Sequence, residues 1–183
     1  MTGNYNSVNL VLAKISREIA KYFSIGKRKL MYFGPLSNKK NYDIRQEAFK
    51  SVALYHGLKY DQIHTTMDVI NSYTEAYKFF NRNNSTEQLS IFCANDNVAI
   101  GVLRACNELN ISVPKQVEII GINNIPASEF TEPPLSTVSI PSEFMGEYAI
   151  RVLLDKIEHN IKIPINHVVS TELIERETTM NKD

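Results

Sequence analysis

The chain has 183 residues, of which 43% are hydrophobic and 22% charged, and its 20 basic residues balance its 20 acidic ones. This composition is typical of a folded globular chain and excludes a disordered one. It also argues against nucleic-acid binding by this chain itself, which needs an excess of basic surface. The first residues lack the pattern of a secretion signal, and no apolar run approaches the ~20 residues of a membrane span, so we expect a cytoplasmic location.

Apolar residues recur at helical and at strand-like spacings, in alternation. In the first such segment Leu12, Ile15, Ile19 and Phe23 are three or four positions apart, which is typical of an amphipathic helix. In chain order we predict a helix at 10–23, a strand at 30–33, a helix at 43–56, a strand at 62–66, a helix at 68–81, a strand at 89–94, a helix at 95–109, a strand at 117–122, an irregular proline-rich segment at 125–141, a helix at 142–159, and closing strands at 168–169 and 173–174.

This alternation predicts an α/β fold in which a parallel sheet has helices on both faces. The uninterrupted apolar runs IFCA and VEIIGI fit strands of a sheet that is covered on both sides. In such sheets ligands bind beyond the carboxyl ends of the strands. The candidate positions are therefore those from Gly34 onward, Asn95-Asp96, and Ile122 to Asn124.

Polar side chains at these strand ends have two interpretations each. Asn95 and Asp96 can cap the following helix, or an amide there can contact sugar hydroxyls or a nucleobase edge; spacing alone favours neither. For Asn123 and Asn124, spacing alone favours a simple turn. Arg45 lies in the first turn of a predicted helix, where the helix dipole disfavours a cation. That conflict indicates a partner such as a ligand oxygen or a carboxylate.

Residues arranged for catalysis or for cofactor binding are absent from the sequence. The two cysteines, Cys93 and Cys106, lie in apolar patterns without CxxC spacing, so we expect buried thiols rather than a metal site or a disulfide. The four histidines lack metal-ligand spacing, and His56 and His159 end predicted helices. Because phosphate-binding glycine loops and a GxSxG elbow are also missing, we expect neither an enzyme nor a cofactor.

Several motifs occur together, in order, in the second half of the chain. They are Ala94-Asn95-Asp96, Ala99-Ile100-Gly101, Val113-Pro114, Gly121-Ile122-Asn123-Asn124, Pro133-Pro134-Leu135-Ser136-Thr137 and the tail from Glu172 to Thr179. Together with Gly26-Lys27-Arg28-Lys29-Leu30 upstream, this pattern resembles the lactose-repressor/galactose-repressor (LacI/GalR) family of bacterial transcription regulators. The resemblance spans about residues 8 to 179, nearly the whole chain.

The resemblance implies a domain plan. Full members carry an N-terminal helix-turn-helix DNA-binding domain and a two-lobed core similar to periplasmic sugar-binding proteins, with the effector between the lobes. On this plan, residues 1–141 are the second (C-terminal) lobe of a periplasmic-binding-protein-like (type I) core. Residues 142–165 are a crossover helix that packs on the first lobe, and residues 166–183 are closing strands and a tail. Operator DNA would be bound only through the N-terminal domain, which this chain lacks.

The resemblance also implies site residues. The family's effector-binding arginine maps onto Arg45, and its asparagine onto Asn95. The family aspartate maps onto Asn123, a departure, because an amide accepts hydrogen bonds less strongly than a carboxylate and also donates. The effector is expected to be a sugar or a sugar derivative.

The family forms dimers through its core, and the expected homodimer interface contains Ile100, Leu103 and Phe130. At Ile100 the alternative is a buried core position. Two other functions stay in view. A transport-type sugar-binding lobe shares the fold but needs export, and an enzyme on a flavodoxin-like sheet is disfavoured because catalytic motifs are missing.

Overall fold

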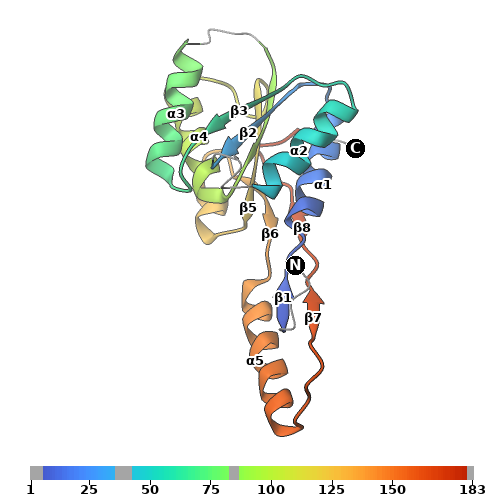
Figure 1. The fold of residues 1–183 in the computed structure, drawn as a ribbon. Coiled ribbons are helices and arrows are strands. Elements are labelled where there is room, and N and C mark those ends of the chain that lie inside the picture. The colour runs from blue at the N-terminus through green and yellow to red at the C-terminus, as the bar shows by residue number, and fades with distance from the viewer. Residues whose placement is uncertain (1–5, 36–42, 83–86, 181–183) are drawn as a thin grey trace.

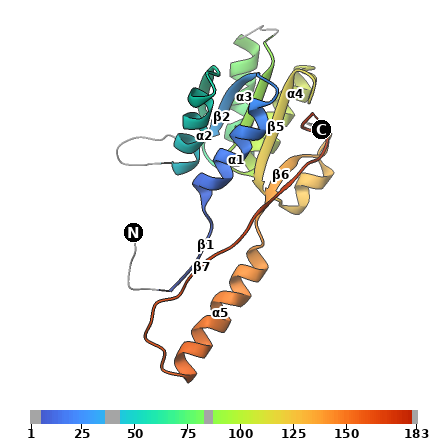
Figure 2. The ribbon, with the colours of Figure 1, turned by 90° about the vertical axis from the view of Figure 1, so that its right-hand side faces the viewer.

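The computed structural model describes residues 6–35, 43–82 and 87–180. An arm extends from a sheet-containing lobe, as Figures 1 and 2 show from two directions. We define the arm as β1 (Ser7–Asn9), α5 (Ser142–Glu158) and β7 (Asn166–Val168). The rest of the described chain forms the lobe.

The lobe contains a six-stranded sheet in the order β3-β2-β4-β5-β6-β8. Its strands are β2 (Lys29–Gly34), β3 (Tyr60–His64), β4 (Leu89–Cys93), β5 (Val117–Asn123), β6 (Ser136–Ser139) and β8 (Glu172–Ile174). Five strands run parallel, and β8 runs antiparallel to β6. The predicted α/β fold is confirmed, with one correction: β6 lies inside the segment 125–141 that was expected to be irregular, together with the short 3-10 helix η1 (Pro126–Phe130).

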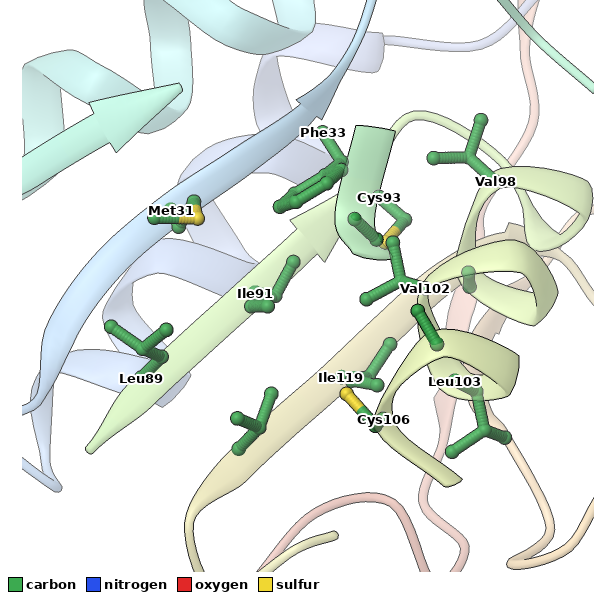
Figure 3. Packing of buried hydrophobic residues seen from close by; sticks show 14 of the residues in the cluster. Met31, Phe33, Leu89, Ile91, Cys93, Val98, Val102, Leu103, Cys106 and Ile119 are labelled. Atoms are coloured by element: carbon green, nitrogen blue, oxygen red, sulfur yellow. The ribbon is translucent and has the colours of Figure 1, made fainter. Parts of the chain in front are cut away.

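Two apolar cores lie on the two faces of this sheet. One face is covered by α1 (Leu12–Ser24) and α2 (Ile44–Tyr55), the other by α3 (Val69–Arg82) and α4 (Asp96–Glu108). Side chains alternate along the strands: Ile91 and Cys93 face the α4 side, as Figure 3 shows, whereas Phe92 packs on Phe49 with ring centroids 5.1 Å apart. The expectation of buried cysteines is confirmed, since both Cys93 and Cys106 are buried free thiols.

The arm has no comparable core. β1 pairs in parallel with β7, and α5 lies beside this two-stranded sheet. None of the 17 residues of α5 is buried. Its exposed large apolar side chains are Phe144, Ile150, Leu153, Leu154 and Ile157. A helix with this composition normally packs against a further layer of protein.

The described part of the chain holds neither a membrane span nor a metal-binding cluster. Among residues 6–35, 43–82 and 87–180, no helix combines the length and the apolar character that crossing a membrane requires. Within the part of the chain that the structure describes, no three His, Cys, Asp or Glu side chains gather closely enough to hold a metal ion.

Candidate functional site

The three candidate ligand contacts lie at one edge of the sheet. Parallel strands bring their carboxyl ends together, and Phe92 of β4 is paired with Ile120 of β5. Asn95 and Asn123 each follow this pair by three residues, so both lie just beyond the same edge. Arg45 reaches the edge through its side chain, because its Nη1 donates a hydrogen bond to the carbonyl oxygen of Ala94 at 3.0 Å. We call this edge, with these three side chains, the carboxyl edge.

Arg45 is held by an aspartate of its own helix start. Asp43 is the N-cap of α2, and its carboxylate accepts from the Arg45 backbone nitrogen at 3.1 Å, from Nε at 2.9 Å and from Nη2 at 3.2 Å. The cation in an unfavourable first-turn position is therefore compensated by a carboxylate, one of the two kinds of partner that the sequence indicated. Hydrogen bonds to this carboxylate also raise the pKa of Arg45 against the opposing effect of burial, which is the largest single influence on it.

Asn95 has the capping role. Its side-chain oxygen accepts from the backbone nitrogen of Val98 at 2.8 Å, and its amide nitrogen donates to the carbonyl of Met67 at 3.3 Å. The second bond joins the start of α4 to the loop before α3, so Asn95 also fixes the neighbouring part of the edge. Its side chain is partly exposed, which keeps it accessible at the carboxyl edge.

Asp96 is buried and turns away toward β6. Its Oδ1 accepts from the hydroxyl of Thr137 at 2.5 Å, and its Oδ2 accepts from the backbone nitrogen of Ile125 at 2.9 Å. Burial raises the pKa of this carboxyl, and the two hydrogen bonds oppose the rise. Asp96 thus anchors the segment that follows β5 and takes no position at the exposed edge.

Asn123 and Asn124 form the turn that ends β5. Both have positive φ angles, 117° and 51°, a conformation that asparagine tolerates better than most residues. The side chain of Asn123 is exposed at the edge. The Asn124 side-chain oxygen accepts from Nη2 of Arg176 at 2.9 Å, which holds the turn from behind. The turn and an exposed amide are both present, so the two interpretations of Asn123 do not conflict.

Three supporting residues were missed in the sequence. They are Asp43 and Tyr32, which hold Arg45, and Arg176, which connects Asn124 to Ser128 and to the Leu135 carbonyl. Tyr32 and Asp43 are 11 positions apart, and Arg176 lies 52 positions from Asn124, so no local pattern connects either pair. Only the aspartate at a helix start carried a local signal, as a preferred N-cap residue.

The three residues expected at a subunit interface lie in different environments. Phe130 ends η1 and is 85% exposed, whereas Ile100 is partly buried and packs against the α3–α4 core. Leu103 is only 2% exposed and belongs to that core, as Figure 3 shows. Leu103 therefore packs in the core of this chain, and a role for it at a subunit interface stays a prediction.

The carboxyl edge offers neutral and charged N–H donors together with amide and carbonyl oxygens. Groups of this kind suit a ligand with several hydroxyls, each of which donates and accepts. The buried thiols Cys93 and Cys106 lie in the core below, and burial raises the pKa of Cys106 to about 12, so neither thiol is ionised at neutral pH.

The chain matches a known protein family over most of its length. The family model described as "Periplasmic binding protein-like domain" matches residues 20–179. The chain belongs to this family. More narrowly, it is a periplasmic-binding-protein-like domain of the LacI/GalR regulators, and its relatives there are transcription regulators rather than enzymes.

Individual relatives agree with this membership. The chain is 30% identical over 181 residues to the HTH-type transcriptional regulator RegA of Clostridium saccharobutylicum, covering 97% of this chain and 51% of RegA. It therefore spans about half the length of that relative. A LacI family regulator from Arthrobacter sp. FB24, solved in complex with lactose, superposes with a TM-score of 0.84 at 21% identity, covering 96% of this chain and 66% of that one. A LacI family regulator from Enterococcus faecium with bound ribose gives 0.83 at 22% identity, covering 98% and 67%.

Proposed function

We propose that this periplasmic-binding-protein-like domain is the effector-sensing part of a LacI-type transcription regulator, and that its effector is a sugar or sugar derivative. The observation that carries the proposal is the convergence of Arg45, Asn95 and Asn123 at one carboxyl edge. Two solved proteins of the same fold, the regulators from Arthrobacter sp. FB24 and Enterococcus faecium, hold lactose and ribose. A polyol matches the donors and acceptors of this edge.

The proposal assigns different roles to segments of the chain. Residues 1–141 act as the C-terminal lobe of the sensing core, residues 142–165 as a crossover helix that packs on a first lobe, and residues 166–183 as closing strands and tail. The unburied apolar side chains of α5 support the second role, because they need a covering layer. Figure 1 shows how far α5 stands from the lobe.

In the proposed mechanism the effector draws the two lobes together and so changes the affinity of a separate helix-turn-helix domain for operator DNA. The protein would act as a homodimer in the cytoplasm, with the face around Phe130 and Ile100 at the subunit contact. Coupling between effector and operator sites is typically about 1–3 kcal/mol. This sets the size of the expected change in operator affinity at about 5- to 150-fold.

Calorimetry on the full-length gene product that carries this chain tests the proposal. We expect one sugar from a panel of pentoses, hexoses and disaccharides to bind, and Arg45→Ala to weaken it at least tenfold. Arg17→Ala, which removes an exposed arginine from α1, is the matched control and should bind like the wild type. If no sugar, nucleoside or phosphorylated sugar gives heat, the sensing role is rejected.

A further inference from the structure

The Arg45 guanidinium is oriented by the carboxylate of Asp43, which lies on the interior side of the carboxyl edge. Asp43 is buried, and its Oδ1 accepts hydrogen bonds from the Arg45 backbone nitrogen and Nε. Its Oδ2 accepts from Arg45 Nη2 at 3.2 Å and from the Tyr32 hydroxyl at 2.6 Å. Two parallel bonds between a carboxylate and a guanidinium fix the plane of the guanidinium. The Arg45 side chain is only 18% exposed, so this fork is largely shielded from water.

The Tyr32 hydroxyl is itself fixed from below. Its ring is buried in the α1–α2 core and lies edge-on to Phe92 at a centroid distance of 5.4 Å. A Cβ atom at Gly34 would lie 2.6 Å from that hydroxyl, so the absence of a side chain there leaves room for it. A chain of contacts therefore runs from the core to the carboxyl edge. The packed ring of Tyr32 holds its hydroxyl, the hydroxyl bonds to Asp43, and Asp43 bonds to Arg45.

This arrangement determines which donors Arg45 can offer. A guanidinium has five N–H groups, and the side-chain bonds to Asp43 and to the Ala94 carbonyl engage one on each nitrogen. One N–H on Nη1 and one on Nη2 lie outside these bonds, in the plane of the guanidinium. Two such donors fit two oxygens of a sugar ring. They also fit a phosphate or a carboxylate, so geometry alone does not separate neutral from anionic ligands.

Among the residues that the structure describes at this edge, charge favours the neutral ligand. Asp43 neutralises Arg45, and the partly exposed Asp68 follows Met67, whose carbonyl is bonded to Asn95. Hydrogen bonds from Asn71 and Thr66 lower the pKa of Asp68 to about 2, so it is an anion at neutral pH. These three residues sum to one negative charge. His64 also ends its strand at this edge, opposite Gly34.

We propose that Asp43, with Tyr32 behind it, is a positioning residue that makes the site selective for an uncharged, hydroxyl-bearing sugar and against its phosphorylated or carboxylated counterpart. The inference rests on the proposed function, in that Arg45 contacts the effector. It goes further by assigning the discrimination to Asp43. An anionic ligand must approach a guanidinium whose charge Asp43 already compensates, and the Asp43 carboxylate repels the added negative charge.

The test compares matched sugar pairs on the full-length gene product by calorimetry: ribose with ribose 5-phosphate, glucose with glucose 6-phosphate, and galactose with galactose 6-phosphate. The wild type should bind the neutral member of the effective pair at least tenfold more tightly. Asp43→Asn keeps a good N-cap residue and a hydrogen-bond acceptor but removes the charge, and should reduce this preference by about tenfold, the order expected for one nearby charge. Asp61→Asn removes an exposed carboxylate of β3 and should leave the preference unchanged.

The variant Tyr32→Phe gives a second test that does not depend on how well Asp43→Asn folds. Inorganic phosphate gives a test that does not depend on which sugar is the effector. Tyr32→Phe keeps the ring but removes one donor to Asp43, and should weaken the neutral sugar several-fold without reversing the preference. Inorganic phosphate, measured by its effect on thermal unfolding, should stabilise Asp43→Asn more than the wild type or Asp61→Asn. If all sugars fail to bind, the proposed function falls, and the phosphate comparison alone decides the role of Asp43.

Two results would overturn the inference. One is a wild type that prefers a phosphorylated sugar, or that binds inorganic phosphate in an Arg45-dependent way. The other is an Asp43→Asn protein that loses neutral and phosphorylated ligands by the same factor and gains no affinity for phosphate, which would make Asp43 merely structural.

Discussion

The helices of the lobe and of the arm differ in how much of their apolar surface is buried. In α4, eight of 13 residues are buried between the sheet and α3, whereas in α5 none of 17 is buried. Ile120 in the lobe is fully buried and Ile157 in the arm is 68% exposed. The same side chain therefore stabilises one region by burial and leaves the other with apolar surface to cover. The lobe contains its own core, and the arm has the composition of a region that is completed by another layer.

Removing a carboxylate should give the largest difference in unfolding free energy between the lobe and the arm. Glu118 is fully buried at the centre of the sheet, 3.6 Å from Nε of Arg28, and accepts hydrogen bonds from Ser90 at 2.8 Å and from the Met180 backbone at 2.9 Å. Glu118→Ala should cost about 3–5 kcal/mol of unfolding free energy, because it leaves the Arg28 charge buried and uncompensated. Glu143→Ala in the arm removes an exposed carboxylate, and urea unfolding should detect a change within about 0.5 kcal/mol.

A matched pair of isoleucines tests the comparison through packing alone. Ile120→Ala should lower the free energy of unfolding by about 2–5 kcal/mol, since it removes buried methyl groups and leaves a cavity. Ile157→Ala should change it by no more than about 0.5 kcal/mol if α5 stays uncovered. A large loss for Ile157→Ala in the full-length gene product, but not in the 183-residue chain, would show that another layer covers the arm there.

A matched pair of glycines should give smaller and opposite effects. A Cβ at Gly101 would lie 2.6 Å from the Val69 carbonyl and 2.7 Å from the Tyr73 nitrogen, so Gly101→Ala should push α3 and α4 apart at a cost of about 1–3 kcal/mol. At Gly146 in α5 a Cβ meets nothing within 4 Å. Gly146→Ala should stabilise the helix by up to about 1 kcal/mol. Thermal unfolding followed by circular dichroism distinguishes the two, and equal effects would contradict the close contact at Gly101.

The smallest expected effect is a pH dependence at a helix start. Asp68 accepts from the Asn71 backbone nitrogen at 2.9 Å near the start of α3, whereas the N-cap of α5 is Pro141, which makes no side-chain capping bond. Because hydrogen bonds lower the pKa of Asp68 from 3.8 to about 2, its carboxylate stabilises the folded state above pH 4, and this contribution is lost as the pH falls toward 2. The difference in stability between the wild type and Asp68→Asn should shrink over that range, and a constant difference would contradict this assignment.

Most of the fold could be predicted from periodicity. The helices and the central strands were located within a few residues, because long apolar patterns report burial on one or both faces. β1 and β6 were missed for a physical reason: each has three or four residues, most of them polar in sequence, and pairing rather than hydrophobicity defines it. The antiparallel direction of β8 depends on where the chain returns from the arm, which periodicity does not encode.

The site could be predicted only in part. The fold rule that ligands meet the carboxyl ends of strands pointed to Asn95 and Asn123, and the unfavourable dipole position of Arg45 indicated a partner. In the sequence Tyr32 has the pattern of an ordinary strand residue. Its hydrogen bond to Asp43 forms because the fold brings β2 next to the start of α2. The apolar character of Leu103 fits a core and an interface equally, and within this chain the residue packs in the α3–α4 core.

The measurement that tests the central claim most directly is amide hydrogen exchange of the full-length gene product with and without its sugar. We predict slower exchange at residues 94–98 and 122–125, at the carboxyl edge, and unchanged exchange at Lys29, Gln88 and Gln116, at the opposite edge of the same strands. Protection at the opposite edge without protection at the carboxyl edge would contradict the account.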